Sequence, residues 1–113
     1  MRLDQIGLQL GNFMSYLSQR QEVISSNIAN ADTPGYLTRD VEAPVDFSLA
    51  FEDARTLVIE SPDLPRHNDG NNVSIDREAR LLAEDTMKFS VASQLVRAQV
   101  KNVRAAIEEG RQS

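Results

Sequence analysis

The sequence predicts a mainly α fold. Two long terminal helices are expected to pack as an antiparallel coiled coil or helical bundle, joined by a short irregular insert that could hold minor β structure. Apolar residues recur every seven positions near both ends of the chain, and all four prolines lie between these two parts. With 113 residues, a single domain is expected. Its predicted parts are an N-terminal helix over 1–31, a turn, insert and loop over 32–73, and a C-terminal helix over 74–110.

The first part has the pattern of a helix that packs along another helix. A sustained seven-residue apolar row favours a left-handed supercoil. The companion row is weaker, because it begins with Ile6 and Phe13 but continues with Arg20 and Asn27. The continuous row consists of Leu3, Leu10, Leu17, Ile24 and Ala31.

The middle part begins with a firm helix stop. Pro34 biases the residue before it away from helical geometry, and Gly35 adopts positive φ easily, so Thr33–Tyr36 is predicted to form a type II turn. Thr56–Ile59 could form a short strand. Pro62–Asn72 is rich in Pro, Asn, Asp and Gly, which predicts an exposed loop or hairpin tip.

The last part gives the strongest structural prediction. Ser74 or Asp76 can cap a helix, neither Gly nor Pro occurs between Val73 and Glu109, and Gly110 is a plausible stop. The apolar row repeats every seven residues from Ile75. Across both helices, the residues expected to pack are Leu10, Leu17, Ile24, Leu82, Phe89, Val96 and Val103.

Composition excludes several classes of function. The net charge of −5 is the opposite of what a nucleic-acid-binding protein or an anionic membrane surface requires. The chain has no cysteine, which excludes disulfides and thiolate metal sites. No apolar run is long enough to span a membrane, and Met1–Leu17 has neither the unbroken apolar stretch nor the cleavage site of a secretory signal. We therefore expect no nucleic-acid partner, no membrane insertion and no cleavable signal peptide.

No catalytic, cofactor or metal site is predicted. The only histidine, His67, lies in a polar loop, and the nearby calcium-loop spacing fails because Pro65 would occupy the first ligand position. No nucleophile, base and anion cradle occur together, so we do not expect an enzyme. Arg97, Lys101 and Arg104 form a basic stripe, which suits the helix dipole and solubility better than it indicates an acidic partner.

One string is more specific than a helix stop. Asparagine side chains can bond to backbone groups at a helix end, small alanines allow close approach, and Pro-Gly fixes the exit angle of the chain. The string is Ser25-Ser26-Asn27-Ile28-Ala29-Asn30-Ala31-Asp32-Thr33-Pro34-Gly35-Tyr36.

This string resembles the N-terminal signature of the flagellar rod, hook and hook-associated proteins. Ala31-Asp32 within it and Arg39-Asp40 after it are most similar to the proximal rod proteins of the flagellar basal-body rod protein family. Asp69–Val73 and Asp76–Glu84 are similar to the family's entry into its C-terminal helix. Leu37 departs from the family, which often has Lys there. The short insert favours a proximal rod subunit over a hook or distal rod subunit, and it leaves another small rod protein as an alternative. The assembly motif that the resemblance implies is Asn27, Ile28, Ala29, Asn30, Ala31, Asp32, Thr33, Pro34, Gly35 and Tyr36.

The resemblance implies a structural subunit of the periplasmic rod that self-associates through its terminal helices and transmits torque from motor to hook. The implied partners are other rod subunits, the membrane-ring adaptor and the flagellar export gate, with export through the flagellar type III channel and no cofactor. The alternative from the residues is a soluble helical adaptor that forms a closed oligomer, whereas a rod subunit would stack in an open helix.

Overall fold

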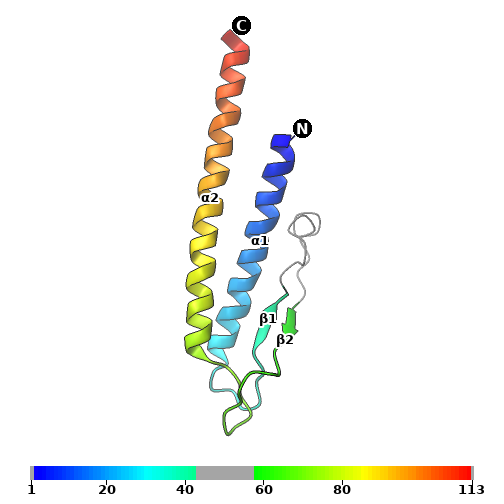
Figure 1. The fold of residues 1–113 in the computed structure, drawn as a ribbon, viewed down its shortest axis with the longest axis vertical. Coiled ribbons are helices and arrows are strands. Elements are labelled where there is room, and N and C mark those ends of the chain that lie inside the picture. Colours follow the sequence, from blue (N-terminus) through cyan, green and yellow to red (C-terminus); the bar gives the residue numbers. More distant parts are fainter. Residues whose placement is uncertain (1, 43–57, 113) are drawn as a thin grey trace.

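The computed structural model describes residues 2–42 and 58–112. The elements occur in the order α1 (Arg2–Ala29), β1 (Arg39–Val41), β2 (Val58–Glu60) and α2 (Ile75–Gln112). Figure 1 shows α1 and α2 side by side and antiparallel, with the small sheet beside the C-terminal half of α1. The molecule is elongated, with extents of 71 × 22 × 15 Å, which confirms the mainly α architecture with two long packed helices.

Helix α1 buries the row that the sequence singles out. Leu17 and Ile24 are 0% and 2% exposed, whereas Leu10, one heptad earlier, is half-buried. The helix ends at Ala29, where the Asn30 N–H donates to the carbonyl of Ser26 at 3.0 Å. Burial therefore concentrates in the half of α1 next to the motif.

Helix α2 begins with a side-chain cap. The Arg77 N–H donates to Ser74 Oγ at 3.3 Å, so Ser74 is the capping residue. Asp76 and Glu78 place negative charge in the first turn, which favours the helix dipole. The predicted stop at Gly110 is wrong, because the helix continues to Gln112. One exposed glycine costs a helix only about 1 kcal/mol, which is too little to end it.

The sheet consists of two short antiparallel strands. Arg39 pairs with Glu60 and Val41 with Val58. The predicted strand at Thr56–Ile59 is confirmed at Val58 and Ile59, and β2 continues to Glu60; residues 56–57 lie outside the described residues. β1 has no counterpart in the predictions, because a three-residue segment that contains Arg and Asp shows no strand pattern.

The contact between the helices is partly polar. Arg20 and Asn27, which break the companion apolar row of α1, face Asp85 and Glu78 of α2. Arg20 and Asn27 are seven residues apart on α1, and Glu78 and Asp85 are seven residues apart on α2. The two bonds therefore form successive layers of one antiparallel contact between the helices, which we call the seam. The buried apolar residues of the described chain are few: Leu17, Ile24, Val41, Val73 and Ala92.

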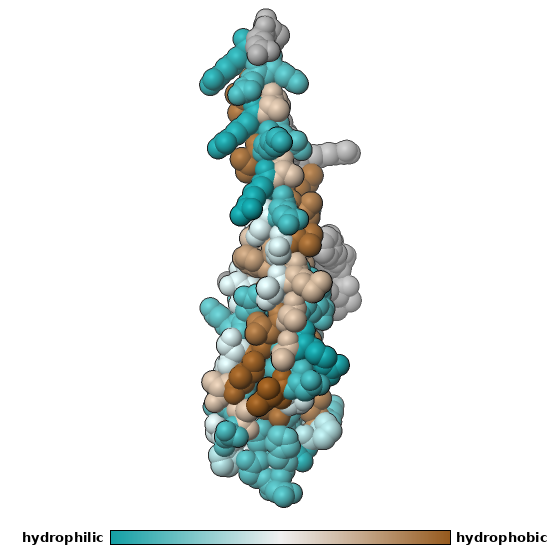
Figure 2. Space-filling model, turned by 90° about the vertical axis from the view of Figure 1, so that its left-hand side faces the viewer, coloured by the Kyte–Doolittle hydropathy of each residue, from teal (hydrophilic) through white to brown (hydrophobic). Residues whose placement is uncertain are grey.

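Apolar surface remains outside this seam. Figure 2 shows apolar patches that alternate with hydrophilic ones along the length of the molecule. Within the ranges 2–42 and 58–112, no helix is long and apolar enough to cross a membrane. The exposed large apolar residues of α2 are Ile75, Met87, Val91, Leu95, Val100 and Ile107.

Candidate assembly site at the helix junction

The residues of the sequence motif meet the segment before α2 at one end of the molecule. We call this region the motif junction; it comprises residues 26–40 and 69–78. It holds more buried polar side chains than buried apolar ones, and each buried polar group must find a partner there to offset its lost hydration. The buried polar residues of the junction are Asn27, Thr38, Asn71, Asn72 and Glu78.

Asn27 is the centre of the motif junction. Its Nδ2 donates to the carbonyl of Arg39 at 2.7 Å and to Glu78 Oε2 at 3.2 Å. Its Oδ1 accepts from the Arg39 N–H at 3.0 Å and from the Tyr36 hydroxyl at 3.2 Å. The side chain thus fills both donor and both acceptor positions, and it joins α1, the turn, β1 and α2.

Asn30 and Asn71 satisfy the backbone of the helix end. Asn30 Nδ2 donates to the carbonyl of Ser26 at 2.8 Å, and its Oδ1 accepts from Thr33 Oγ1 at 3.0 Å. Asn71 Nδ2 donates to the carbonyls of Asn30 and Thr33, both at 2.8 Å. Residues from both halves of the chain therefore cap the C-terminal end of α1, where carbonyls lack helical partners.

The turn after α1 has the predicted geometry. Gly35 has φ +74°, and the Tyr36 N–H donates to the carbonyl of Thr33 at 3.2 Å, as expected for a type II turn with Pro34 before the glycine. The Gly35 N–H also donates to the carbonyl of Asp69 at 2.9 Å. The turn is thus held against the loop that leads into α2.

Asn72 holds the start of β1. Its Oδ1 accepts from the Thr38 N–H at 2.6 Å, and its Nδ2 donates to the carbonyl of Ser61 at 2.7 Å. The prediction of an exposed loop over Pro62–Asn72 is therefore wrong at its last two positions, because Asn71 and Asn72 are buried. Loop composition predicts polarity but does not reveal that polar side chains replace missing backbone partners.

A connected series of charged side chains runs across the junction. Arg77 Nη2 lies 3.2 and 3.0 Å from the two oxygens of Asp40, and Nη1 lies 2.7 Å from Glu78 Oε1. Ser61 Oγ also donates to Asp40. Burial lowers the pKa of Arg77, but the hydrogen bonds and charges of Asp40 and Glu78 outweigh burial and raise it. These bonds connect β1 and the residue that follows β2 to the start of α2.

Arg20 and Asp85 form the next layer of the seam. Arg20 Nη1 lies 3.1 Å from Asp85 Oδ1, and the Asp85 side chain is fully buried. Asp85 Oδ2 is buried without a hydrogen-bond partner among the described residues. Burial raises the pKa of Asp85, and the positive charges of Arg20 and Lys88 only partly oppose that effect.

The structure places the sequence-predicted residues unevenly. Asn27 is buried, and Asn30, Ile28, Ala31 and Tyr36 are half-buried. The remaining motif residues are exposed: Ala29, Asp32, Thr33, Pro34 and Gly35. Of the predicted packing residues, only Leu17 and Ile24 are buried in the chain itself, and the half-buried ones are Leu10, Leu82, Phe89, Val96 and Val103.

Sequence reasoning missed most of the polar residues that pair across the seam and junction outside the motif. A usable signal was present, because Arg20 and Asn27 are seven apart, as are Glu78 and Asp85. Polar residues at matching heptad positions of two antiparallel helices indicate paired layers. The missed residues include Asn71, Asn72, Glu78 and Asp85.

Over residues 2–42 and 58–112, no group of three or more His, Cys, Asp or Glu residues could hold a metal ion. His67 is exposed, and its backbone N–H donates to the carbonyl of Asn71 at 2.6 Å. The hydrogen bonds of the junction fix the relative directions of α1, the turn, β1 and α2.

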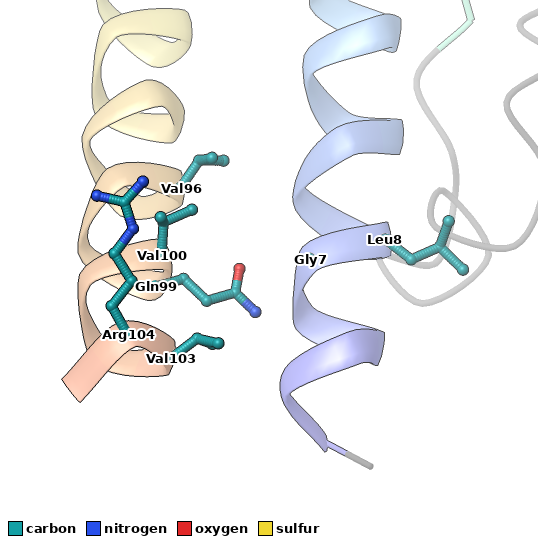
Figure 3. A pocket seen from close by; sticks show the side chains of 7 residues that line it. All are labelled: Gly7, Leu8, Val96, Gln99, Val100, Val103 and Arg104. Atoms are coloured by element: carbon teal, nitrogen blue, oxygen red, sulfur yellow. The ribbon is translucent and has the colours of Figure 1, made fainter. Parts of the chain in front are cut away.

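Two apolar grooves lie along the helices away from the junction. Val96, Gln99 and Val103 point from α2 towards α1 near Gly7, and they line a groove of about 550 Å³ (Figure 3). Leu8 points away from α2 in the same view. The second groove, of about 440 Å³, is lined by Leu10, Phe13, Met87, Lys88, Val91, Ala92 and Leu95.

Comparisons with known proteins agree with this geometry. The family model described as "Flagella basal body rod protein" matches residues 13–36, the second half of α1 and the turn. The flagellar basal body rod protein FlgB of Yersinia enterocolitica is 29% identical over 82% of this chain and 86% of its own length. FlgB of Escherichia coli is 29% identical and FlgB of Salmonella typhimurium 28% identical, with the same coverage of both chains.

The fold and the junction thus define a structural subunit built for assembly, in which paired terminal helices are locked at one end. The chain is similar to flagellar basal body rod proteins, both in the segment that the family model matches and over most of its length. Among these proteins, FlgB is the one to which the cited similarities extend along most of the chain. The closed-oligomer adaptor is not favoured by these relationships.

Proposed function

We propose that this chain is a subunit of the proximal rod, which stacks in an open helix through α1 and α2 and carries torque from the motor towards the hook. The observation that carries the proposal is the combination of a polar junction with apolar residues left exposed along α2. A chain that buries so little apolar surface by itself gains stability when neighbouring helices cover the rest.

The short insert supports the proximal position. Only residues 42–57 separate β1 from β2, so little chain is available there for a large outer domain. The members of the curated FlgB group cited above are matched over 86% of their length, so they are of similar size. The proposed partners are other rod subunits, the membrane-ring adaptor and the export gate, reached by the flagellar type III route.

A deletion strain tests this function. Cells without the gene should be non-motile and should contain membrane rings without a rod, and a plasmid copy of the gene should restore both. Mass spectrometry of purified basal bodies should find the chain beside the other rod subunits. Rods of normal length in the deletion strain would contradict the proposal, and a fixed, closed oligomer as the only assembled form would favour the adaptor instead.

A further inference from the structure

The buried carboxylate of Glu78 joins the two halves of the chain within the junction. Glu78 is 0% exposed and lies in the first turn of α2, whereas the motif belongs to the other end of the chain. Oε2 accepts from Asn27 Nδ2 at 3.2 Å, and Oε1 accepts from Arg77 Nη1 at 2.7 Å. The carboxylate thus stands between a guanidinium and an amide.

The Glu78 carboxylate, together with the Arg39 carbonyl, sets which way the Asn27 amide faces. An ionised carboxylate can only accept, so it requires the NH₂ group of Asn27 on its side. Oδ1 must then face the Arg39 N–H and the Tyr36 hydroxyl, where it accepts at 3.0 and 3.2 Å. If the amide were rotated by 180°, its NH₂ group would face the Arg39 N–H, donor against donor. Its oxygen would then face the Glu78 carboxylate, acceptor against acceptor.

We propose that Glu78 is a positioning residue for the N-terminal motif: through Asn27 it fixes the turn at Tyr36 and the entry into β1. The C-terminal helix therefore sets the geometry of the motif at the end of the N-terminal helix. The inference rests on the proposed function only where it treats the motif as an assembly element, and its test uses the isolated full-length chain.

The neighbouring amides of Thr38 and Arg39 make a sharp test. The Arg39 N–H is bonded to Asn27, whereas the Thr38 N–H is bonded to Asn72 and does not depend on Glu78. We expect Glu78→Gln to accelerate hydrogen exchange of the Arg39 amide by about tenfold, because the single carbonyl oxygen of the glutamine pairs with the charged Arg77 and its NH₂ group then opposes the NH₂ group of Asn27. Exchange of the Thr38 amide should change by less than about twofold. NMR of the ¹⁵N-labelled chain measures both.

Asp85→Asn is the matched control. Asp85 is also fully buried and lies one heptad further along α2, but it is bonded to Arg20. This variant removes the same charge from the same helix and should leave exchange at Arg39 within about twofold of the parent chain. Equal acceleration by both variants would mean general loosening of the helix pair and would overturn the positioning role.

A double-mutant cycle tests whether Glu78 acts through Asn27. Once Asn27→Ala has removed the intermediate group, adding Glu78→Gln should change exchange at Arg39 by less than about twofold. A further tenfold acceleration in the double variant, or no acceleration in Glu78→Gln alone, would overturn the proposal. If Glu78→Gln lowers the helical circular-dichroism signal, Glu78→Asp replaces it, because it keeps the charge but is one methylene too short to reach Asn27.

Discussion

Asparagine supplies most of the specific bonding in this chain. Asn27, Asn30, Asn71 and Asn72 each use their amide groups as substitutes for missing backbone partners at the end of α1 and the start of β1. Asn27 alone makes four side-chain bonds. An alanine at such a position would leave buried groups unpaired on several segments at once, which costs more than the bonds themselves contribute.

The positive φ of Gly35 leads to a prediction for the turn. A Cβ at Gly35 would meet no other atom within 4 Å, so the cost of a side chain there arises only from φ +74°. We expect both Gly35→Ala and Gly35→Val to lower the free energy of unfolding by about 1–2 kcal/mol, as measured by urea denaturation.

Gly11 is the control for this prediction. It lies within α1, where a Cβ also meets nothing within 4 Å, so Gly11→Ala should instead raise the free energy of unfolding by about 1 kcal/mol. If Gly35→Val strains the turn, fewer copies should enter basal bodies although α1 still forms. Unchanged stability and normal swimming in Gly35→Val would remove the turn from the assembly account.

At the scale of the elements, the sequence predicts the helices well and their contact poorly. Heptad rows and turn residues are local signals, and the helix boundaries predicted from them lie within about a turn of the observed boundaries. The choice of the face that α2 turns to α1 is not local. It depends on the pairing of Glu78 and Asp85 with residues about fifty to sixty-five positions away.

The junction could be predicted only in part. The motif string pointed to Asn27, Asn30 and the Gly35 turn, because their roles at a helix end follow from chemistry near in sequence. The contributions of Asn71 and Asn72 follow from the tertiary approach of the second half of the chain, which loop composition does not indicate.

The seam leads to a prediction about pH. Burial raises the pKa of Asp85 in the folded chain above its value in the unfolded chain, so the folded state favours the protonated form. The resulting stabilisation is fully present below the unfolded pKa and is lost as pH rises through the folded pKa. Relative to Asp85→Asn, the parent chain should therefore lose stability as pH rises from about 4 towards neutrality.

Urea denaturation of both chains across this pH range measures the difference. Glu84 and Lys88 stay in both chains, so the difference reports Asp85 together with its interactions with these two neighbours. A parent chain that instead gains stability over Asp85→Asn as pH rises would mean that the attraction of Arg20 outweighs burial.

Leu17 leads to a prediction about the apolar side of the seam. It is fully buried, so Leu17→Asp removes apolar contacts and adds a buried charge without a partner. We expect the free energy of unfolding to fall by about 3 kcal/mol or more. The matched variant Leu8→Asp, at a residue 64% exposed on the same helix, should cost less than about 0.5 kcal/mol. Similar losses in both variants would show that α1 does not pack through the predicted row.

At the scale of the whole molecule, the hydrogen-bonded polar residues gather at one end, and apolar residues remain exposed along the rest of α2. The motif junction locks the base of the helix pair, while the far half of α2 keeps apolar residues on its surface. The register set by Asn27–Glu78 and Arg20–Asp85 brings the start of α1 opposite Gln99 and its neighbours, so the last turns of α2 extend beyond α1 (Figure 1). An elongated subunit with this layout suits stacking along an axis.

Incorporation of Val91→Asp into basal bodies tests the central claim most directly, namely that the exposed apolar face of α2 is covered by neighbouring subunits in the rod. Val91 is 56% exposed in the single chain, so the substitution should leave its helical signal unchanged. The matched variant Ser90→Asp adds the same charge one residue earlier, on a different face of α2. We expect quantitative mass spectrometry of purified basal bodies to show about a tenfold or greater loss of Val91→Asp, because its charge would be buried between subunits, and parent levels of Ser90→Asp. Parent levels of Val91→Asp in basal bodies of a motile strain would contradict the account.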